Sequence, residues 1–251
     1  MQIIHRAPFV IHSFDTLGST NDYLKQLADA HEFICAVAAE QTAGRGRRAR
    51  TWVSTAGEGL YLSVLLRPPT ATNLALLSLL AAVAVAETIA QDNVAGLDIK
   101  WPNDVLIGER KVCGILVEGA SSGAQTLRIV VGIGVNLNQQ EFPSEISATA
   151  TSLALALGRA VNVDEFRDRL LMRLAHWYAL WQRDAGRAVV ERWQQLSSYA
   201  RGQQVSVALD DEVVCGETAG LAADGSLRLR LADGTARTML AGEVTRLRKD
   251  Q

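Results

Sequence analysis

One stretch, residues 100–118, constrains the fold of this chain more than any other. It reads KWPNDVLIGERKVCGILVE. Pro102 fixes its own φ and pushes the residue before it toward an extended conformation, so the chain should enter this stretch along a strand. Gly108 stands in a short polar gap between two runs rich in β-branched residues, which is typical of a β-hairpin. Such a hairpin brings Asp104 and Lys111 together, either as chemical groups of a site or as a surface ion pair on an ordinary hairpin.

A second strand, predicted at residues 127–138, carries glycines on one face. In LRIVVGIGVNLN, alternation puts Gly132 and Gly134 on one side and their apolar neighbours on the other. Bare positions leave a shallow floor on which a flat ligand can lie, with Asn136 on the same face to hydrogen-bond a base edge. The alternative is a close strand–helix contact, with Asn136 as a turn residue at the strand end.

Polar residues begin the first predicted helix. After a short strand at residues 10–14, Ser19 or Thr20 can cap a helix that continues through Asn21. The exposed amides at the helix start, together with these three side chains, can bind a polar or anionic group of a ligand. Capping alone explains Ser19 and Thr20 equally well.

An arginine-rich loop, residues 44–50, follows a strand predicted at residues 33–39. Its sequence GRGRRAR sets four arginines beside two glycines, and both charge repulsion and glycine flexibility oppose ordering. Arginine's planar fork suits phosphate, so three interpretations compete: a phosphate clamp over a nucleotide, a basic arm on nucleic acid, or a solvated flexible loop. Neither G-x-x-x-x-G-K-[ST] nor G-x-G-x-x-G after a strand is present, so any ATP must bind in another way.

Composition narrows the class of protein. At 251 residues the chain suits one large domain and a small one. A net charge of −2 and a pI of about 6.1 give no global electrostatic case for nucleic-acid binding, so any anion site must be local. Three widely spaced cysteines indicate a reducing compartment, and the N-terminus lacks a signal-peptide layout; together these predict a cytoplasmic protein.

The remaining elements predict an α/β (α+β) fold followed by a small barrel. The apolar residues 74–91 predict a buried helix, because their apolar run is too short to span a bilayer. Helices are predicted at residues 163–186, with an amphipathic pattern, and 188–199. Short strands separated by Asp-Asp and Asp-Gly turns are then predicted at residues 203–209, 213–222, 226–231 and 243–248. We therefore expect a mixed β-sheet with packed helices over residues 1–200 and a small β-barrel over residues 201–251, in which no site residue is assigned.

Taken together, these stretches resemble the biotin–protein ligase family, whose members attach biotin to the carboxyl-carrier subunit of carboxylases. The matching segments occur in the family's order and are STN (19–21), QTAGRGRRAR (41–50) with Trp52, KWPND (100–104), KVCGILVE (111–118) and GIGVN (132–136). The resemblance implies a C-terminal barrel of the SH3-like kind. One departure is Ala49, where the family usually has glycine; an alanine fits there if its φ is negative.

The resemblance implies a two-step reaction without an enzyme nucleophile. The biotin carboxylate attacks the α-phosphorus of ATP to give biotinyl-5′-AMP and pyrophosphate, and a carrier lysine then attacks the acyl-adenylate and releases AMP. Catalysis of this kind is mainly positioning and charge neutralisation. The implied catalytic residues are Lys111, Arg47 and Asp104. The implied biotin contacts are Ser19, Thr20, Asn21, Gln41, Gly44, Arg45, Arg47, Lys111, Gly114 and Ile115. The implied contacts with ATP or the adenylate are Arg45, Arg47, Arg48, Arg50, Trp52, Lys111 and Asn136.

The resemblance also implies substrates and partners. ATP and biotin are the substrates, Mg²⁺ assists without an assigned protein ligand, and the acceptor is the biotin carboxyl carrier protein of acetyl-CoA carboxylase. The arginine loop should order on ligand binding and shield the adenylate from water. Only about ten residues precede the first strand, too few for the DNA-binding domain that many relatives carry. We therefore expect a ligase with no nucleic-acid partner, no membrane contact and at most a weak homodimer formed through sheet edges.

Two other hypotheses compete with this one. A lipoate or octanoate ligase or transferase on the same fold is the alternative enzyme, although the arginine loop and KWPND favour biotin. A non-catalytic nucleic-acid-binding module that uses the arginine loop is the third hypothesis.

Overall fold

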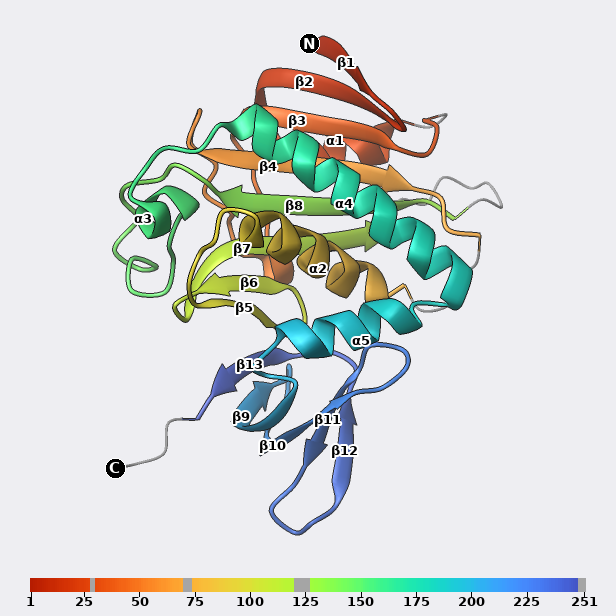
Figure 1. Ribbon diagram of the computed structural model, residues 1–251, viewed down its shortest axis with the longest axis vertical. Helices are drawn as coiled ribbons and strands as arrows, with labels where there is room; N and C mark the ends of the chain where they lie inside the picture. Colours follow the sequence, from red (N-terminus) through yellow and green to blue (C-terminus); the bar gives the residue numbers. More distant parts are fainter. Residues whose placement is uncertain (28–29, 70–73, 120–126, 248–251) are drawn as a thin grey trace.

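An eight-stranded mixed sheet forms the centre of the molecule (Figure 1). The computed structural model describes residues 1–27, 30–69, 74–119 and 127–247. The strands of this sheet are β1 (Gln2–Arg6), β2 (Phe9–Leu17), β3 (Ile34–Gln41), β4 (Gly59–Leu66), β5 (Leu97–Lys100), β6 (Asp104–Ile107), β7 (Arg110–Gly119) and β8 (Ile129–Asn136). Their order in the sheet is β1-β2-β3-β4-β8-β7-β6-β5. β2 and β3 are parallel, because the crossover through α1 (Thr20–Gln26) joins them, and the other neighbouring pairs are antiparallel.

Helices α2 (Leu76–Ala90) and α4 (Val163–Asp184) cover one face of this sheet, and α1 lies on the opposite face (Figure 1). A helix that is apolar on every side must be buried all round, and α2 is enclosed by the sheet, α4 and α5 (Arg187–Leu196). The buried helix predicted at residues 74–91 is therefore confirmed. The amphipathic helix is confirmed as well, although α4 ends at Asp184 rather than residue 186, because Ala185 and Gly186 both have positive φ.

A second, five-stranded antiparallel sheet lies below the large one (Figure 1). Its strands are β9 (Arg201–Ala208), β10 (Val213–Leu221), β11 (Leu227–Arg230), β12 (Ala236–Met239) and β13 (Glu243–Arg246). Their order is β12-β11-β10-β9-β13, as expected for a small SH3-like barrel. Of the predicted segment 243–248, residue 248 lies outside the described residues.

The small barrel packs against α2 and the turn after β5. Trp101 Nε1 donates a hydrogen bond of 3.0 Å to the carbonyl oxygen of Gly225, in the turn between β10 and β11. Gly225 has φ +86°, and a Cβ there would lie 2.6 Å from a Leu76 methyl and 2.9 Å from one of Leu79. Only glycine suits such a close approach with that backbone conformation. The barrel is thereby joined to the same KWPND stretch that begins the hairpin.

Among the described residues, four elements were not predicted: β1, β12, the short helix α3 (Leu153–Leu157) and a single 3-10 turn, η1 (Arg47–Ala49), in the arginine loop. β1 is an edge strand whose side chains are mostly exposed, so it lacks the apolar alternation that identifies a half-buried strand. β12 also lies at the edge of its sheet, with three of its four residues not buried. α3 is too short to show a helical period, and the hydroxyl of Ser152, which accepts from Leu155 N at 3.2 Å, marks its start.

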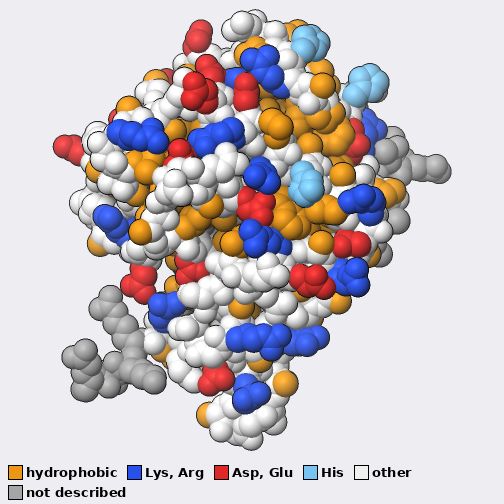
Figure 2. All heavy atoms as spheres, in the orientation of Figure 1, with side chains coloured by type: hydrophobic (Ala, Val, Ile, Leu, Met, Phe, Trp, Pro, Cys, Tyr) orange, Lys and Arg blue, Asp and Glu red, His pale blue; other side chains and the backbone are white. Residues whose placement is uncertain are grey.

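Charges of both signs are mixed over the face seen in Figure 2, without a large area of one sign. This distribution agrees with the net charge of −2. Within the described residues, no helix is both long and apolar enough to cross a membrane.

Candidate functional site

A cavity of about 1020 Å³ opens on the face of the large sheet that carries α1. Its lining comes from the start of α1, the end of β3, the arginine loop (residues 44–50), the β6–β7 hairpin, β8 and the loop after it. Residues 242–246 of the small barrel complete the rim. The cavity thus gathers segments that are far apart in the sequence, including each motif singled out above.

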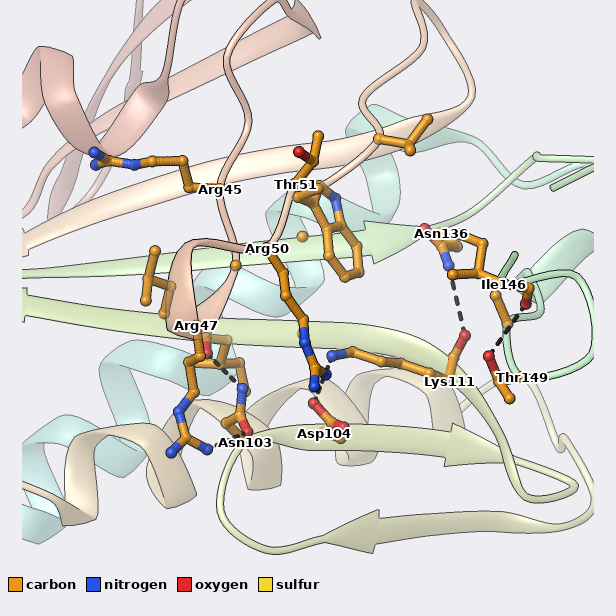
Figure 3. Close-up of a pocket in the computed structure, with 18 of the residues that line it drawn as sticks. Arg45, Arg47, Arg50, Thr51, Asn103, Asp104, Lys111, Asn136, Ile146 and Thr149 are labelled. Carbon is orange, nitrogen blue, oxygen red and sulfur yellow. Dashed lines mark hydrogen bonds and ion pairs between the residues drawn. The ribbon is translucent and has the colours of Figure 1, made fainter. Parts of the chain in front are cut away.

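The hairpin brings Asp104 and Lys111 together, as predicted. Lys111 Nζ lies 2.7 Å from Asp104 Oδ1, and the two side chains point toward one another (Figure 3). Lys100 Nζ lies 3.7 Å from the other carboxylate oxygen. Backbone hydrogen bonds of 2.7 and 2.9 Å tie Lys111 to Thr149 and Thr151, which fix the start of its side chain. Two lysine charges share one carboxylate, so this part of the cavity keeps a net positive charge.

The glycine face of β8 exists as predicted, but it is not bare. The Trp52 indole covers it: a Cβ added at Gly134 would lie 2.5 Å from the ring, and one at Gly114 would lie 2.9 Å from it. Glycines suit this floor because a flat aromatic ring packs directly on the backbone. The indole Nε1 is buried and has no hydrogen-bond partner among the described residues, and Lys111 Nζ lies 5.5 Å from the ring centre. A flat ligand therefore meets Trp52 before it meets the glycines.

Asn136 holds the wall behind Lys111. Its side-chain nitrogen donates to the carbonyl oxygens of Thr151 at 3.1 Å and Lys111 at 3.5 Å. Its side-chain oxygen accepts from Gln139 Nε2 at 3.4 Å. The side chain also lines the cavity, so its predicted role beside adenine stays a prediction.

A polar wall lies at the start of α1. Ser19 is the helix cap, as one of the two predicted candidates, and its hydroxyl accepts from Asp22 N at 3.4 Å. The Thr20 amide donates to Gln41 Oε1 at 2.8 Å. Asn21 is only 5% exposed and lies against Gly132, where a Cβ would overlap its side-chain oxygen. Ser19 caps the helix and also lines the cavity, together with Thr20 and Asn21. Thr20 Oγ1 lies 3.0 Å from Gln41 Oε1.

Two residues of this wall were missed by sequence reasoning. Ser63, fully buried on β4, contacts Thr20 Oγ1 at 2.7 Å and Asn21 Oδ1 at 2.6 Å. Glu118, at the end of β7, accepts from Asn21 Nδ2 at 2.7 Å and from Lys25 Nζ at 3.0 Å. A serine inside the otherwise apolar strand GLYLSVLL was the available signal for Ser63. Glu118 is the last residue of the segment KVCGILVE, but no role in the site was predicted for it.

The arginine loop is held by carboxylates of the chain itself. Arg45 lies 2.6 Å from Asp22 and 3.3 Å from Glu118, and it points away from Lys111 (Figure 3). Arg48 lies 3.1 Å from Asp210, in the turn between β9 and β10. The sequence predicted that an anionic group offsets the repulsion between these arginines. In this structure the anionic groups are carboxylates of the chain itself.

The barrel supplies the remaining contacts of the loop. Arg50 forms a two-pronged pair with Glu243, with bonds of 2.9 and 2.6 Å, and this bond holds the pKa of the Glu243 carboxyl below its ordinary value. Arg47 donates to Asn103 Oδ1 at 3.0 Å and to the Gly242 carbonyl at 3.4 Å, and burial lowers the pKa of its guanidinium. Residues 242–246 of the C-terminal segment, in which the sequence assigned no site residue, therefore line the candidate site. No local motif marks Glu243, because its role depends on how the two sheets pack together.

The backbone of the loop also differs from expectation. Ala49 has φ +56°, not the negative value at which an alanine fits without strain, and Arg48 before it has φ +54°. A left-handed conformation costs about 1–2 kcal/mol for a residue with a Cβ. At Gly44, a Cβ would lie 2.5 Å from the Trp52 carbonyl oxygen. The loop therefore holds two residues with a Cβ in a left-handed conformation, and a glycine at a position too crowded for a Cβ.

The described residues of the cavity offer no resident metal site. No group of three or more His, Cys, Asp or Glu side chains within the described ranges is arranged to hold an ion. Asp104, a carboxylate that lines the cavity, is already paired with two lysines. Mg²⁺ usually binds through one or two carboxylates together with substrate phosphates, so it fits here only as a companion of a nucleotide.

Two protein-family models match this chain. The model described as "Biotin/lipoate A/B protein ligase family" matches residues 13–136. The model described as "Biotin protein ligase C terminal domain" matches residues 201–246.

Characterised relatives carry consistent names. A biotin--[acetyl-CoA-carboxylase] ligase from Mycobacterium tuberculosis is 35% identical over 245 residues, which is 92% of this chain and 86% of the relative. The bifunctional ligase/repressor BirA of Bacillus subtilis is 42% identical over 153 residues, or 59% of this chain. The match spans about half of that protein, 47% of its length.

Solved structures share the whole architecture. A biotin protein ligase from Aquifex aeolicus, in complex with biotin and ATP, superposes with a TM-score of 0.84 at 29% sequence identity. The superposition covers 95% of this chain and 99% of that structure.

Proposed function

The chain belongs to the biotin/lipoate A/B protein ligase family, and on that premise we propose that it is a biotin–protein ligase. It activates biotin with ATP to biotinyl-5′-AMP and then transfers biotin to a lysine of the biotin carboxyl carrier protein of acetyl-CoA carboxylase. One observation carries the proposal: a single cavity is lined by the polar wall at α1, the Asp104–Lys111 pair and the arginine loop. These groups suit, in that order, an uncharged polar ring, a carboxylate and a triphosphate.

In the first step, a biotin carboxylate oxygen bonds to the α-phosphorus, the bond to the bridging oxygen breaks, and pyrophosphate leaves. Both reactants are anions, so a cation between them lowers the barrier by cancelling their repulsion. Lys111 is the residue for this role, and Asp104 orients it through the 2.7 Å bond. Arg45, Arg47, Arg48 and Arg50 would bind phosphate oxygens.

Binding of ATP requires these arginines to change partners. Arg50 and Arg48 are paired with carboxylates of the small barrel, and both bonds are partly exposed to water. Exposed ion pairs of this kind contribute only about 0–1 kcal/mol each, so a triphosphate can replace them. We propose that the loop closes over the nucleotide in this exchange and shields the adenylate from water, with Trp52 and Asn136 on the adenine side.

In the second step, the carrier amine attacks the acyl carbon of the adenylate, the bond to the phosphate oxygen breaks, and AMP leaves. Biotin stays in place between Ser19, Thr20, Asn21 and Gln41 on one side and Gly44, Gly114 and Ile115 on the other. Asp104 is the carboxylate available to orient the amine or accept its proton. Mg²⁺ enters with the ATP phosphates.

The proposal is tested by ATP–pyrophosphate exchange with biotin, lipoate and octanoate as separate substrates. We expect exchange with biotin alone, followed by transfer of labelled biotin to the carrier protein. An absence of exchange with biotin refutes the proposal, and exchange with lipoate instead would revive the alternative ligase. A cytoplasmic location and a weak homodimer stay predictions.

A further inference from the structure

A chain of hydrogen bonds runs behind the polar wall and ends on Glu118. Gln41 Oε1 accepts the Thr20 amide, and Thr20 Oγ1 lies 2.7 Å from Ser63 Oγ. Ser63 Oγ lies 2.6 Å from Asn21 Oδ1, and Asn21 Nδ2 lies 2.7 Å from a Glu118 oxygen. Thr20, Asn21 and Gln41 line the cavity, whereas Ser63 and Glu118 are behind them.

The Glu118 carboxylate fixes the direction of this chain. Burial raises the pKa of the Glu118 carboxyl, but hydrogen bonds from Asn21 and Lys25 outweigh burial and leave the pKa below its ordinary value, so the group is ionised near neutral pH. A carboxylate only accepts hydrogen bonds. Asn21 must therefore present its nitrogen to Glu118 and its oxygen to Ser63, because the flipped amide would set two oxygens 2.7 Å apart.

Counting protons settles the remaining directions. Ser63 has one hydroxyl proton, and the Asn21 oxygen at 2.6 Å requires it. Thr20 Oγ1 lies 2.7 Å from Ser63 Oγ and 3.0 Å from Gln41 Oε1, and its single proton can serve only one of them. With the Ser63 proton given to Asn21, the shorter contact to Ser63 takes the Thr20 proton. Gln41 is held independently, because its nitrogen donates to Ser54 Oγ at 3.0 Å and its oxygen faces Thr20.

The cavity wall consequently presents acceptors. Among the contacts of the described residues, Thr20 Oγ1, Asn21 Oδ1 and Gln41 Oε1 each keep at least one lone pair, and neither hydroxyl proton is directed into the cavity. A wall of this polarity selects a ligand ring with N–H donors, because a ring without them leaves desolvated acceptors unpaired.

We propose that Glu118 is a positioning residue that sets the hydrogen-bond direction of this wall, so that Thr20, Asn21 and Gln41 accept from the N–H groups of a cyclic urea. The proposal rests on the proposed function, since biotin carries such a ring. Glu118 acts through Asn21 and Ser63 and does not itself touch the ligand. It therefore determines specificity from behind the wall.

Replacing Glu118 by glutamine should reverse the direction. Lys25 Nζ, 3.0 Å from one oxygen, requires an oxygen at that end, so the new amide nitrogen faces Asn21. Arg45, 3.3 Å from the oxygen that this nitrogen replaces, keeps its shorter bond of 2.6 Å to Asp22. Asn21 then turns its oxygen toward residue 118 and its nitrogen toward Ser63, and the wall loses an acceptor. Adding Asn21→Asp restores the original direction with nearly the same shape, because an aspartate at position 21 accepts from both Ser63 and the new amide. The net charge of the double variant equals that of the natural chain.

The test is biotin binding by isothermal titration calorimetry on the full chain, with the natural protein, E118Q, N21D and the double variant. We expect each single variant to bind biotin about tenfold or more weakly and the double variant to recover to within about threefold. Lys25→Met is the matched control, because it removes an ion pair of Glu118 and leaves the bond to Asn21. It should keep biotin affinity within about threefold.

A folded double variant that binds biotin no better than the weaker-binding single variant overturns the proposal. Two substitutions that only damage the structure would not compensate for each other. Should the single variants fail to fold, Ser63→Ala gives an independent answer. It frees the Thr20 proton to turn to Gln41 Oε1, 3.0 Å away, and should weaken biotin about tenfold. Unchanged biotin affinity in Ser63→Ala overturns the proposal. A natural protein that binds no biotin at all overturns the proposed function instead.

Discussion

Replacing Lys111 by alanine should slow adenylate formation by about 10²–10³-fold while the protein remains folded. A unit charge about 4 Å from a developing anion contributes about 4 kcal/mol at an effective dielectric constant near 20. Removal of one such group from an active site typically costs about 2.7–4 kcal/mol, which corresponds to the same range of rates. The Lys111 side chain is 34% exposed and Asp104 keeps Lys100 at 3.7 Å, so the ion pair contributes about 1 kcal/mol or less to stability.

ATP–pyrophosphate exchange at saturating biotin measures this step directly. Lys100→Ala is the matched control, because it removes the second cation on the same carboxylate, and it should slow exchange less than about tenfold. Transfer of biotin from supplied biotinyl-5′-AMP to the carrier should suffer much less in Lys111→Ala, since no two anions meet in that step. Exchange within tenfold of the natural rate would remove Lys111 from the mechanism. Equal losses in the two variants would show that only the charge around Asp104 matters.

Three further predictions concern the arginine loop. Arg47→Ala should raise the dissociation rate of biotinyl-5′-AMP about tenfold while affecting biotin binding without ATP much less, as measured by stopped-flow fluorescence; an unchanged rate contradicts a clamp. Ala49→Gly should raise Tm by about 1–3 °C in differential scanning fluorimetry, because it removes a left-handed alanine, and a lower Tm would show that φ +56° is not strained. Because its bond to Arg50 holds the pKa of Glu243 below 4.5, that bond stabilises the fold above this pH and is lost as the pH falls through the lowered value. Urea unfolding should therefore find Glu243→Gln less stable than the natural protein at pH 7, and the difference should shrink as the pH falls through the lowered pKa of Glu243. A difference independent of pH would contradict the assignment.

Local chemistry explains which parts of the site were predictable. The turn at Gly108 sets Leu106 opposite Lys111, so the hairpin alone brings Lys111 near Asp104 on the neighbouring strand. The β-bulge between Val105 and Leu106, which places Asp104 opposite Gly114, was not predicted. Alternation likewise places Gly132 and Gly134 on one face of β8 without knowledge of the rest of the fold.

Features that depend on distant packing were not predictable in this way. The Trp52 indole could cover the glycine face only because the arginine loop returns across the sheet, and the sequence near Trp52 does not encode that path. Glu243 reaches Arg50 across 193 positions of the chain, and Ser63 meets Asn21 across 42. Ala49 shows a different limit, because contacts of neighbouring arginines with the barrel hold it in a backbone conformation that its own side chain disfavours.

The hydrogen bond from Trp101 to Gly225 has a consequence for engineering by domain exchange. The barrel covers part of α2 and receives the indole of the same stretch that positions Asp104, so its removal would expose apolar helix surface and leave a buried donor without a partner. A barrel taken from a relative could replace this one only if it brings a glycine to the equivalent turn and a carbonyl to the indole. The two sheets therefore have to be exchanged, designed or evolved as a matched pair.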